Sequence, residues 1–239
     1  MLGEVSRRFP FLRWCPIQIR ALVSLLANII DELQVIRHLT LGKGWCFIDV
    51  GAHVGAFSVL ASRLVGHEGI VVSVEPDPDN FIALLFNIRL MGKNILPFKV
   101  AVWKENKSRK LFRADSGALS SLVRRSTNFL QVECMTLDSL LEAIAPRIDK
   151  RILAVKVDVE GAEREVLEGA KNVLKEVKVL LIEVHSADGL RQVIGLLSDS
   201  HFRTESIGRK HVIARRIAIG PDSVKAKSTP ISIQHAPSQ

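Results

Sequence analysis

Cysteine is scarce in this sequence of 239 residues, which contains only Cys15, Cys46 and Cys134. These three residues lie far apart along the chain, whereas disulfide frameworks and structural zinc sites use several cysteines at short, regular spacings. The sequence therefore excludes both kinds of stabilisation as organising features. So few cysteines, odd in number, suit a reducing compartment, and we expect a cytoplasmic protein.

Long apolar runs are missing as well. The longest apolar stretch in a helical pattern, 21–30, is bracketed by Arg20 and Asp31, and a membrane-spanning helix needs about 20 consecutive apolar residues. No convincing small-residue cleavage site follows the stretch, so a signal peptide is not the preferred interpretation. We expect no transmembrane segment.

Tyrosine is absent altogether, and aromatic residues make up 5% of the chain. The net charge of +8 would suit a polyanionic partner, but a basic balance also simply keeps a protein soluble. Apolar residues at 47% and charged residues at 24% are typical of a globular protein. A chain of this length accommodates one domain with a full core and short extensions.

The most informative stretch is Phe47–Ser58, with the sequence FIDVGAHVGAFS. It predicts a buried strand that ends near Asp49, then a glycine turn and the start of a helix. Gly51 and Gly55 allow the backbone to bend and to approach a ligand closely. The run differs from the dinucleotide pattern G-x-G-x-x-G because His53 stands where a middle glycine would be, so a nicotinamide dehydrogenase is the least favoured interpretation.

An acid also ends the next predicted strand, 70–74, in the sequence VEPDPDN. Glu75 follows Gly51 by 24 residues, which is the position of the acid that accepts hydrogen bonds from ribose hydroxyls in nucleotide-binding βαβ units. Pro76 stops the strand, and Asn80 is expected to cap a helix that begins at Phe81. A third strand is predicted over 95–103. It places three apolar residues where an adenine ring could lie, and these are Ala101, Val102 and Trp103.

A third acid-bearing strand end follows in ILAVKVDVEGAEREVLEGA. The pattern predicts a strand over 152–157 and a turn at Gly161 into a helix. Asp158, Glu160 and Glu163 should therefore gather at the sheet edge that also carries Asp49 and Glu75. Several carboxylates in one cleft are costly unless they face a cation, a metal or hydrogen-bond donors, and a sulfonium cofactor is such a cation.

Four stretches, taken together, resemble the FkbM family of S-adenosylmethionine-dependent methyltransferases over roughly residues 46–184. They are FIDVGAHVGAFS, VEPDPDN, TLDSL and KVDVEGAEREVLEGA. The resemblance implies an α/β, Rossmann-like class I methyltransferase fold: a seven-stranded, mostly parallel sheet with a C-terminal antiparallel strand pair and helices on both faces. It also implies that residues 51–55 wrap the methionine part of S-adenosyl-L-methionine and that Glu75 holds its ribose. His53 departs from the family, whose members usually carry Asn there. The expected cofactor-binding residues are Asp49, Gly51, Ala52, His53, Gly55, Ser58, Glu75, Pro76, Asn80, Ala101, Val102 and Asp158.

Three segments organise the chain on this interpretation. Residues 1–41 form an amphipathic helical extension, which either covers the sheet or serves as a substrate wall. Residues 42–218 form the methyltransferase domain and end in a hairpin, 202–217. Residues 219–239 lack periodicity and are expected to be disordered.

The expected catalytic residues are Asp158, His185 and Glu160. Asp158 lies nearest the methyl donor by its place in the motif, and the ordinary pKa of a histidine suits a general base. His185 ends a predicted strand, 179–184, and could equally be a structural histidine satisfied by the backbone. Asp158 and Glu160 could alternatively bind Mg²⁺, which prefers oxygen ligands.

The leading functional hypothesis is an enzyme that methylates a hydroxyl oxygen of a small molecule, sugar or lipid. An RNA or protein methyltransferase is the first alternative, because the C-terminal region is rich in Arg and Lys. Against it, no stacking aromatic accompanies these charges, and the Asn-Pro-Pro-Tyr type of motif for amino-group methylation is absent. A non-catalytic cofactor-binding protein is the second alternative, but it should have lost one of the cleft acids Asp49, Glu75 and Asp158, and all three are present.

Overall fold

The computed structural model of the chain describes residues 17–91, 94–113, 120–123, 126–148 and 152–217. The predicted disordered tail, 219–239, lies outside the described residues, and so does the first part of the predicted extension, 1–16.

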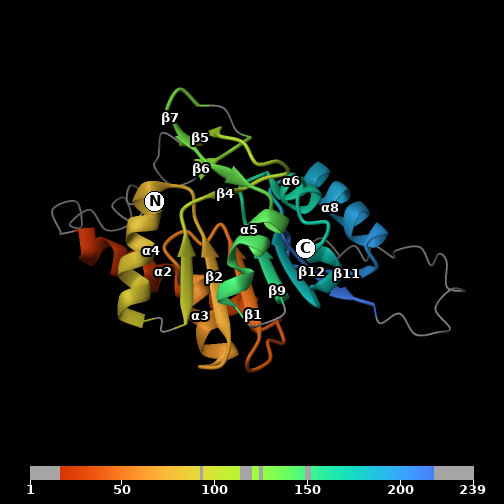
Figure 1. Cartoon of the computed structure of the whole chain (residues 1–239), viewed down its shortest axis with the longest axis horizontal. Coiled ribbons are helices and arrows are strands. Elements are labelled where there is room, and N and C mark those ends of the chain that lie inside the picture. The colour runs from red at the N-terminus through yellow and green to blue at the C-terminus, as the bar shows by residue number, and fades with distance from the viewer. Residues whose placement is uncertain (1–16, 92–93, 114–119, 124–125, 149–151, 218–239) are drawn as a thin grey trace, which may run out of the picture.

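A seven-stranded sheet forms the centre of the molecule (Figure 1), with the strand order β11-β12-β10-β9-β1-β2-β3. β12 runs antiparallel to both of its neighbours, and the remaining strand pairs are parallel. This arrangement confirms the predicted class I methyltransferase sheet with its C-terminal antiparallel pair. The strands are β1 (Cys46–Val50), β2 (Ile70–Val74), β3 (Ile95–Phe98), β9 (Ile152–Val157), β10 (Val179–Glu183), β11 (Phe202–Ile207) and β12 (His211–Arg216).

Helices cover both faces of the sheet because its strands carry apolar side chains on both sides. Phe47 and Ile48 are fully buried in two different core clusters, one on each face of β1. One face packs against α2 (Ile17–Ile36), α3 (Ala56–Val65) and α4 (Pro78–Met91). The other packs against α5 (Leu137–Ile144), α6 (Glu163–Glu168), α7 (Val173–Glu176) and α8 (Ala187–Asp199).

The predicted strand over 95–103 is wrong in its extent. The chain leaves the main sheet after β3, and β4 (Ala101–Val102) pairs with β8 (Cys134–Met135) in a separate sheet. The N–H of Ala101 donates to the carbonyl of Glu133 rather than to the main sheet. Hydrogen bonding to a distant segment, which local sequence does not encode, therefore ends the strand early.

A small antiparallel sheet lies above the ends of the main strands (Figure 1). It is formed by β5 (Arg109–Arg113), β6 (Ser120–Ser121) and β7 (Phe129–Val132). This small sheet thus covers the carboxyl edge of the main sheet, where α/β proteins bind ligands.

Two helix starts show how local sequence sets the ends of these elements. Thr136 caps α5, since its side chain accepts a hydrogen bond from the N–H of Ser139. α4 begins at Pro78 instead of Phe81, because proline is favoured in the first turn of a helix. Asn80 therefore lies inside that turn, and its side chain reaches Glu75 instead of capping the helix.

The predicted absence of a membrane-spanning helix holds for the part of the chain that the structure describes, where no helix is both long enough and apolar enough.

Candidate functional site

The glycine turn after β1 brings two strand ends into contact. Gly51 has φ +83°, and a Cβ at this position would lie 1.8 Å from the carbonyl oxygen of Asp158. Gly55 also has a positive φ, and a Cβ there would collide with the side chain of Leu84 on α4. Glycine is thus required at both positions, and the turn can lie close to the loop that follows β9.

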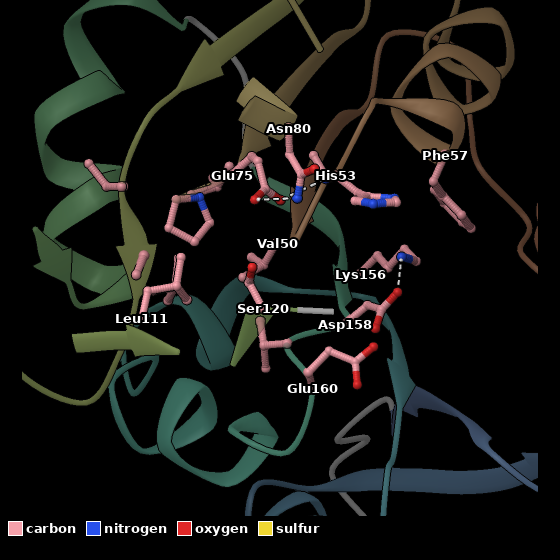
Figure 2. A pocket seen from close by; sticks show the side chains of 18 of the residues that line it. Val50, His53, Phe57, Glu75, Asn80, Leu111, Ser120, Lys156, Asp158 and Glu160 are labelled. Carbon is pink, nitrogen blue, oxygen red and sulfur yellow. Dashed lines mark hydrogen bonds and ion pairs between the residues drawn. The ribbon is translucent and has the colours of Figure 1, made fainter. Parts of the chain in front are cut away.

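A cavity of about 220 Å³ opens at this edge of the sheet. Figure 2 shows that its side chains come from several elements, with Glu75 and Asn80 near one end and Lys156 and Asp158 near the other. Residues of the small sheet close it from above. Its lining consists of Asn28, Glu32, Val50, Gly51, Ala52, His53, Ala56, Phe57, Val74, Glu75, Pro76, Asn80, Val100, Ala101, Val102, Leu111, Ser120, Leu122, Lys156, Asp158, Val159 and Glu160.

Glu75 is held by neutral donors. The backbone N–H of His53 donates to Oε2 at 2.8 Å, the N–H of Asp77 donates to Oε1 at 3.0 Å, and the side-chain amide of Asn80 lies 3.4 Å from the same oxygen. Burial raises the pKa of Glu75 to about 7, although these donors act in the opposite direction. A fixed carboxylate with lone pairs left over can accept hydrogen bonds from two vicinal hydroxyls.

His53 adopts φ +60°, a region in which Asn, Asp and His are the commonest residues after glycine. Its departure from the Asn of the family therefore preserves the backbone conformation. Burial lowers the pKa of His53 to about 3, so its imidazole is neutral. Its Nε2 is buried and has no hydrogen-bond partner among the described residues.

An ion pair fastens the small sheet over the cavity. Arg113 of β5 donates two hydrogen bonds to Asp77, at 2.6 and 2.8 Å, and the hydroxyl of Ser120 donates a third. Burial alone would raise the pKa of Asp77, but the bonds from Arg113 and Ser120 outweigh it and lower that pKa. The cover is thus tied to the loop that carries Glu75.

Three of the predicted cofactor-binding residues, Asp49, Gly55 and Ser58, are not among the residues that line the cavity. Asp49 and Ser58 lie behind its wall, fully buried, where the hydroxyl of Ser58 donates to Asp49 at 2.5 Å and that of Ser73 donates to Ser58 at 2.7 Å. The nine other predicted cofactor-binding residues do line it. Asp49 and Ser58 therefore support the glycine turn through buried hydrogen bonds behind the cavity wall.

Lys156 occupies the other end of the cavity. It pairs in register with Asp49 across β9 and β1, and its ammonium lies 3.0 Å from Asp158 and 3.8 Å from Glu32 of α2. Burial opposes the charged form, but Asp158, Glu32 and Asp49 together hold the pKa of Lys156 above its ordinary value. A buried ammonium thus balances part of the acid cluster that the sequence predicts.

His185 lies behind this end, outside the lining, among four carboxylates. Its Nδ1 is 2.7 Å from Glu163, and its Nε2 is 3.3 Å from Glu160, 3.7 Å from Glu183 and 3.9 Å from Asp158. Burial alone would lower the pKa of His185, but Glu160 and Glu163 outweigh it and raise that pKa to about 10. The residue is therefore an imidazolium at neutral pH and has no free lone pair with which to accept a proton.

Possible metal ligands differ from the predicted pair of Asp158 and Glu160. Within the described residues, ligand atoms of Asp158, Glu183 and His185 lie within 4.8 Å of one another. A metal there would have to displace the proton of His185, whose pKa is raised. The magnesium hypothesis stays a prediction.

The sequence analysis missed Lys156, Asn28, Glu32 and Arg113. Lys156 could have been noticed, because it is the one charged residue within the apolar strand ILAVKV. Asn28 and Glu32 face the cavity only because α2 packs beside α3 and α4, and Arg113 meets Asp77 only across 36 residues. These contacts have no local sequence signal.

Comparison with known proteins places this site in a family context. A family model described as the methyltransferase FkbM domain matches residues 49–207, which is more than half of the chain. The hexuronic acid methyltransferase AglP of Haloferax volcanii is 27% identical over 158 residues, covering 66% of this chain and 63% of that protein. The match thus spans less than two thirds of the relative.

Two solved structures share the fold. A candidate O-methyltransferase from Klebsiella pneumoniae superposes with a TM-score of 0.51 at 10% identity, covering 90% of this chain and 96% of that one. A candidate rRNA methylase from Clostridium thermocellum gives a TM-score of 0.50 at 10% identity, covering 80% and 96%. At this identity the likeness concerns the fold alone.

Proposed function

This chain belongs to the FkbM methyltransferase family, and from that premise we propose that it transfers a methyl group from S-adenosylmethionine to a hydroxyl oxygen of a sugar-type acceptor. The observation that carries the proposal is the single cavity with Glu75 at one end and Asp158, Glu160 and Lys156 at the other.

The residues present fit the cofactor. Glu75 offers a fixed carboxylate to ribose hydroxyls, and the apolar pair Ala101 and Val102 lines the cavity where an adenine would lie. The glycine turn would offer its backbone to the cofactor, and Asp158 would offer negative charge to the sulfonium. When bound, S-adenosylmethionine supplies an electrophilic methyl group.

The protein contributes position and charge to the reaction. Good alignment of two reactants supplies about 7 to 11 kcal/mol of a barrier, and the cover held by Arg113 and Asp77 restricts water. We propose that Asp158 and Glu160 lie beside the reacting centre. The imidazolium of His185 then fixes these two carboxylates instead of acting as a base.

The proposal that the methyl acceptor is a sugar is based on a relative. AglP is named as a hexuronic acid methyltransferase, and the cavity here has polar side chains that suit a polyhydroxylated molecule, with Asn28, Glu32 and Lys156 among its lining residues. A lipid acceptor would call for a more apolar wall.

An RNA acceptor remains the alternative, but several cations of the C-terminal hairpin already have partners. Arg216 donates to the carbonyl of Val177, and Arg215 contacts Glu205 and the carbonyl of His38. Two further cations of the basic C-terminal region, Lys225 and Lys227, lie outside the described residues. A cytoplasmic location likewise stays a prediction, drawn from the cysteine content.

Two measurements test the proposal. Calorimetric titration with S-adenosylhomocysteine should give micromolar binding. Incubation with methyl-labelled S-adenosylmethionine should label glucuronides, galacturonides or glucosides, but not RNA. Binding without transfer to any sugar would contradict the acceptor class, and the lack of binding would contradict the methyltransferase activity.

A further inference from the structure

One wall of the cavity comes from α2, which precedes the region that the family model matches. Asn28 and Glu32 are four residues apart and therefore lie on the same side of this helix. Both line the cavity, whereas their neighbours Asp31 and Gln34 are exposed. The helix thus turns two polar side chains inward, next to the buried apolar residue Leu25.

Two polar atoms of residues that line the cavity have no partner within the part of the chain that the structure describes. The side-chain nitrogen of Asn28 and Nε2 of His53 are buried and make no hydrogen bond within the described part of the chain. Leaving a buried polar group unpaired costs about 1 to 3 kcal/mol. A ligand with hydroxyl groups would supply the missing partners and remove this cost.

Among the three acids that line this end of the cavity, Glu32 lies farthest from its nearest cation. Asp158 lies 3.0 Å from the ammonium of Lys156 and Glu160 lies 3.3 Å from the imidazolium of His185, but Glu32 is 3.8 Å from Lys156. Burial raises the pKa of Glu32, and Lys156 acts in the opposite direction. The other charged groups that act on it are Asp158, Asp49 and Glu183.

We propose that Asn28, His53 and Glu32 form the acceptor subsite. Asn28 and His53 bind hydroxyl groups of a sugar-type acceptor, and Glu32 accepts the proton of the hydroxyl that is methylated. This inference rests on the proposed function. In the step, the bond from sulfur to the methyl carbon breaks and a carbon–oxygen bond forms. The hydroxyl proton passes to the carboxylate of Glu32, and the sulfonium becomes a neutral thioether.

The charges favour a hydroxyl over a carboxylate as the methylated group. Glu32, Asp158 and Glu160 line this end of the cavity with a single ammonium, that of Lys156, so the carboxylates outnumber the cations in the lining and an acceptor carboxylate would meet an excess of like charge. The product should therefore be a methyl ether, which resists mild alkali, and not a methyl ester, which mild alkali cleaves.

The test uses the full chain with p-nitrophenyl glucuronide, galacturonide and glucoside as acceptor probes. Glu32→Gln should lower kcat by about 10² to 10⁴-fold, the usual contribution of a general base, and should abolish the rise of kcat with pH. Asn28→Ala should raise KM for the sugar about tenfold, as expected for one lost hydrogen bond. Asp31→Asn and Gln34→Ala, on the exposed side of the same helix, are the matched controls.

Titration with S-adenosylhomocysteine distinguishes a failure of the acceptor subsite from a failure of the proposed function. Variants that keep cofactor binding within threefold and lose transfer support the subsite. A wild-type protein that neither binds the cofactor product nor transfers methyl groups contradicts the proposed function itself. Wild-type transfer with an unchanged kcat in Glu32→Gln and an unchanged KM in Asn28→Ala overturns the subsite alone, and an alkali-labile product overturns its preference for hydroxyls.

Thermal unfolding of each variant shows whether a loss of activity merely reflects a loss of folded protein. Should Glu32→Gln unfold below the assay temperature, Glu32→Asp keeps the charge beside Lys156 and shortens the reach to the acceptor. A folded Glu32→Asp with full kcat would then contradict the assignment of the base, and a folded variant with reduced kcat and intact cofactor binding would support it.

Discussion

Glu75 and Asp158 both follow parallel strands at the same edge of the sheet, but the protein compensates their charges differently. Glu75 is surrounded by backbone N–H groups and an amide, and burial raises its pKa to about 7. Asp158 lies 3.0 Å from the buried ammonium of Lys156, with the imidazolium of His185 3.9 Å away on its other side.

The difference follows from what each end of the cavity would meet. Neutral donors hold Glu75 in place without satisfying its charge, which leaves it able to bind the hydroxyls of a ribose. Two fixed cations, Lys156 and His185, lie beside Asp158 instead, so that this end of the cavity pairs acids with cations. One end of the cavity is thus suited to binding the hydroxyls of a ribose, and the other to holding carboxylates beside cations.

Removal of Lys156 should have the largest effect. In Lys156→Met, Asp158, Glu32 and Asp49 lose their shared cation, and breaking a buried ion pair in this way costs about 3 to 5 kcal/mol of the free energy of unfolding. The loss should be smaller at pH 5 than at pH 8, since burial raises the pKa values of Glu32 and Asp49, which take up protons as the pH falls. Denaturant unfolding measures it, with the exposed Lys99→Met as the control. An equal loss at both pH values would show that the pairing is unimportant.

Glu75→Ala should abolish the carboxylate at the other end, and it should also lower the free energy of unfolding because the N–H groups of His53 and Asp77 lose their acceptor. Each hydrogen bond to a charged group contributes about 1.5 to 3 kcal/mol, so the loss of two ribose contacts should weaken S-adenosylhomocysteine binding more than 100-fold. Calorimetry with Glu68→Ala, on an exposed loop, as the control measures the effect. Binding within threefold of the wild type would remove Glu75 from the cofactor site.

The pH dependence of stability should reveal the raised pKa of Glu75. A carboxyl group whose folded-state pKa is raised from 4.5 to about 7 contributes stability at low pH that is lost as pH rises through 7. Without cofactor, the wild type should therefore lose about 2 kcal/mol relative to Glu75→Gln between pH 5 and pH 7. Parallel unfolding curves for the two proteins would indicate an ordinary pKa.

His185 should show the smallest effect, namely no titration near neutrality. Because its pKa is raised to about 10 by Glu160 and Glu163, against the effect of burial, the imidazole proton signals should stay constant between pH 5 and pH 8. Nuclear magnetic resonance with labelled histidine checks this, and the exposed His67 provides a comparison. A midpoint near 6.5 would restore His185 as a candidate base.

Much of this architecture was accessible from the sequence because its signals are local. The strand and glycine turn around Asp49 and Gly51 have the expected form, and Glu75 and Asp158 follow two strands at the same carboxyl edge of the sheet. The extent of the third strand was not accessible, since the N–H of Ala101 bonds to Glu133, which lies 32 residues further along the chain.

Periodicity, glycine positions and acids at strand ends are properties of short segments, so the sequence was enough to predict the sheet, the cofactor turn and the family resemblance. The ionisation of the site depends on distances between segments that are remote in the chain. A histidine with an ordinary pKa in isolation becomes an imidazolium because β10, α6 and the loop after β9 bring four carboxylates within 4 Å of it. Likewise, Asn28 and Glu32 face the cavity only after α2 has packed beside α3 and α4, since burial and electrostatics act through space.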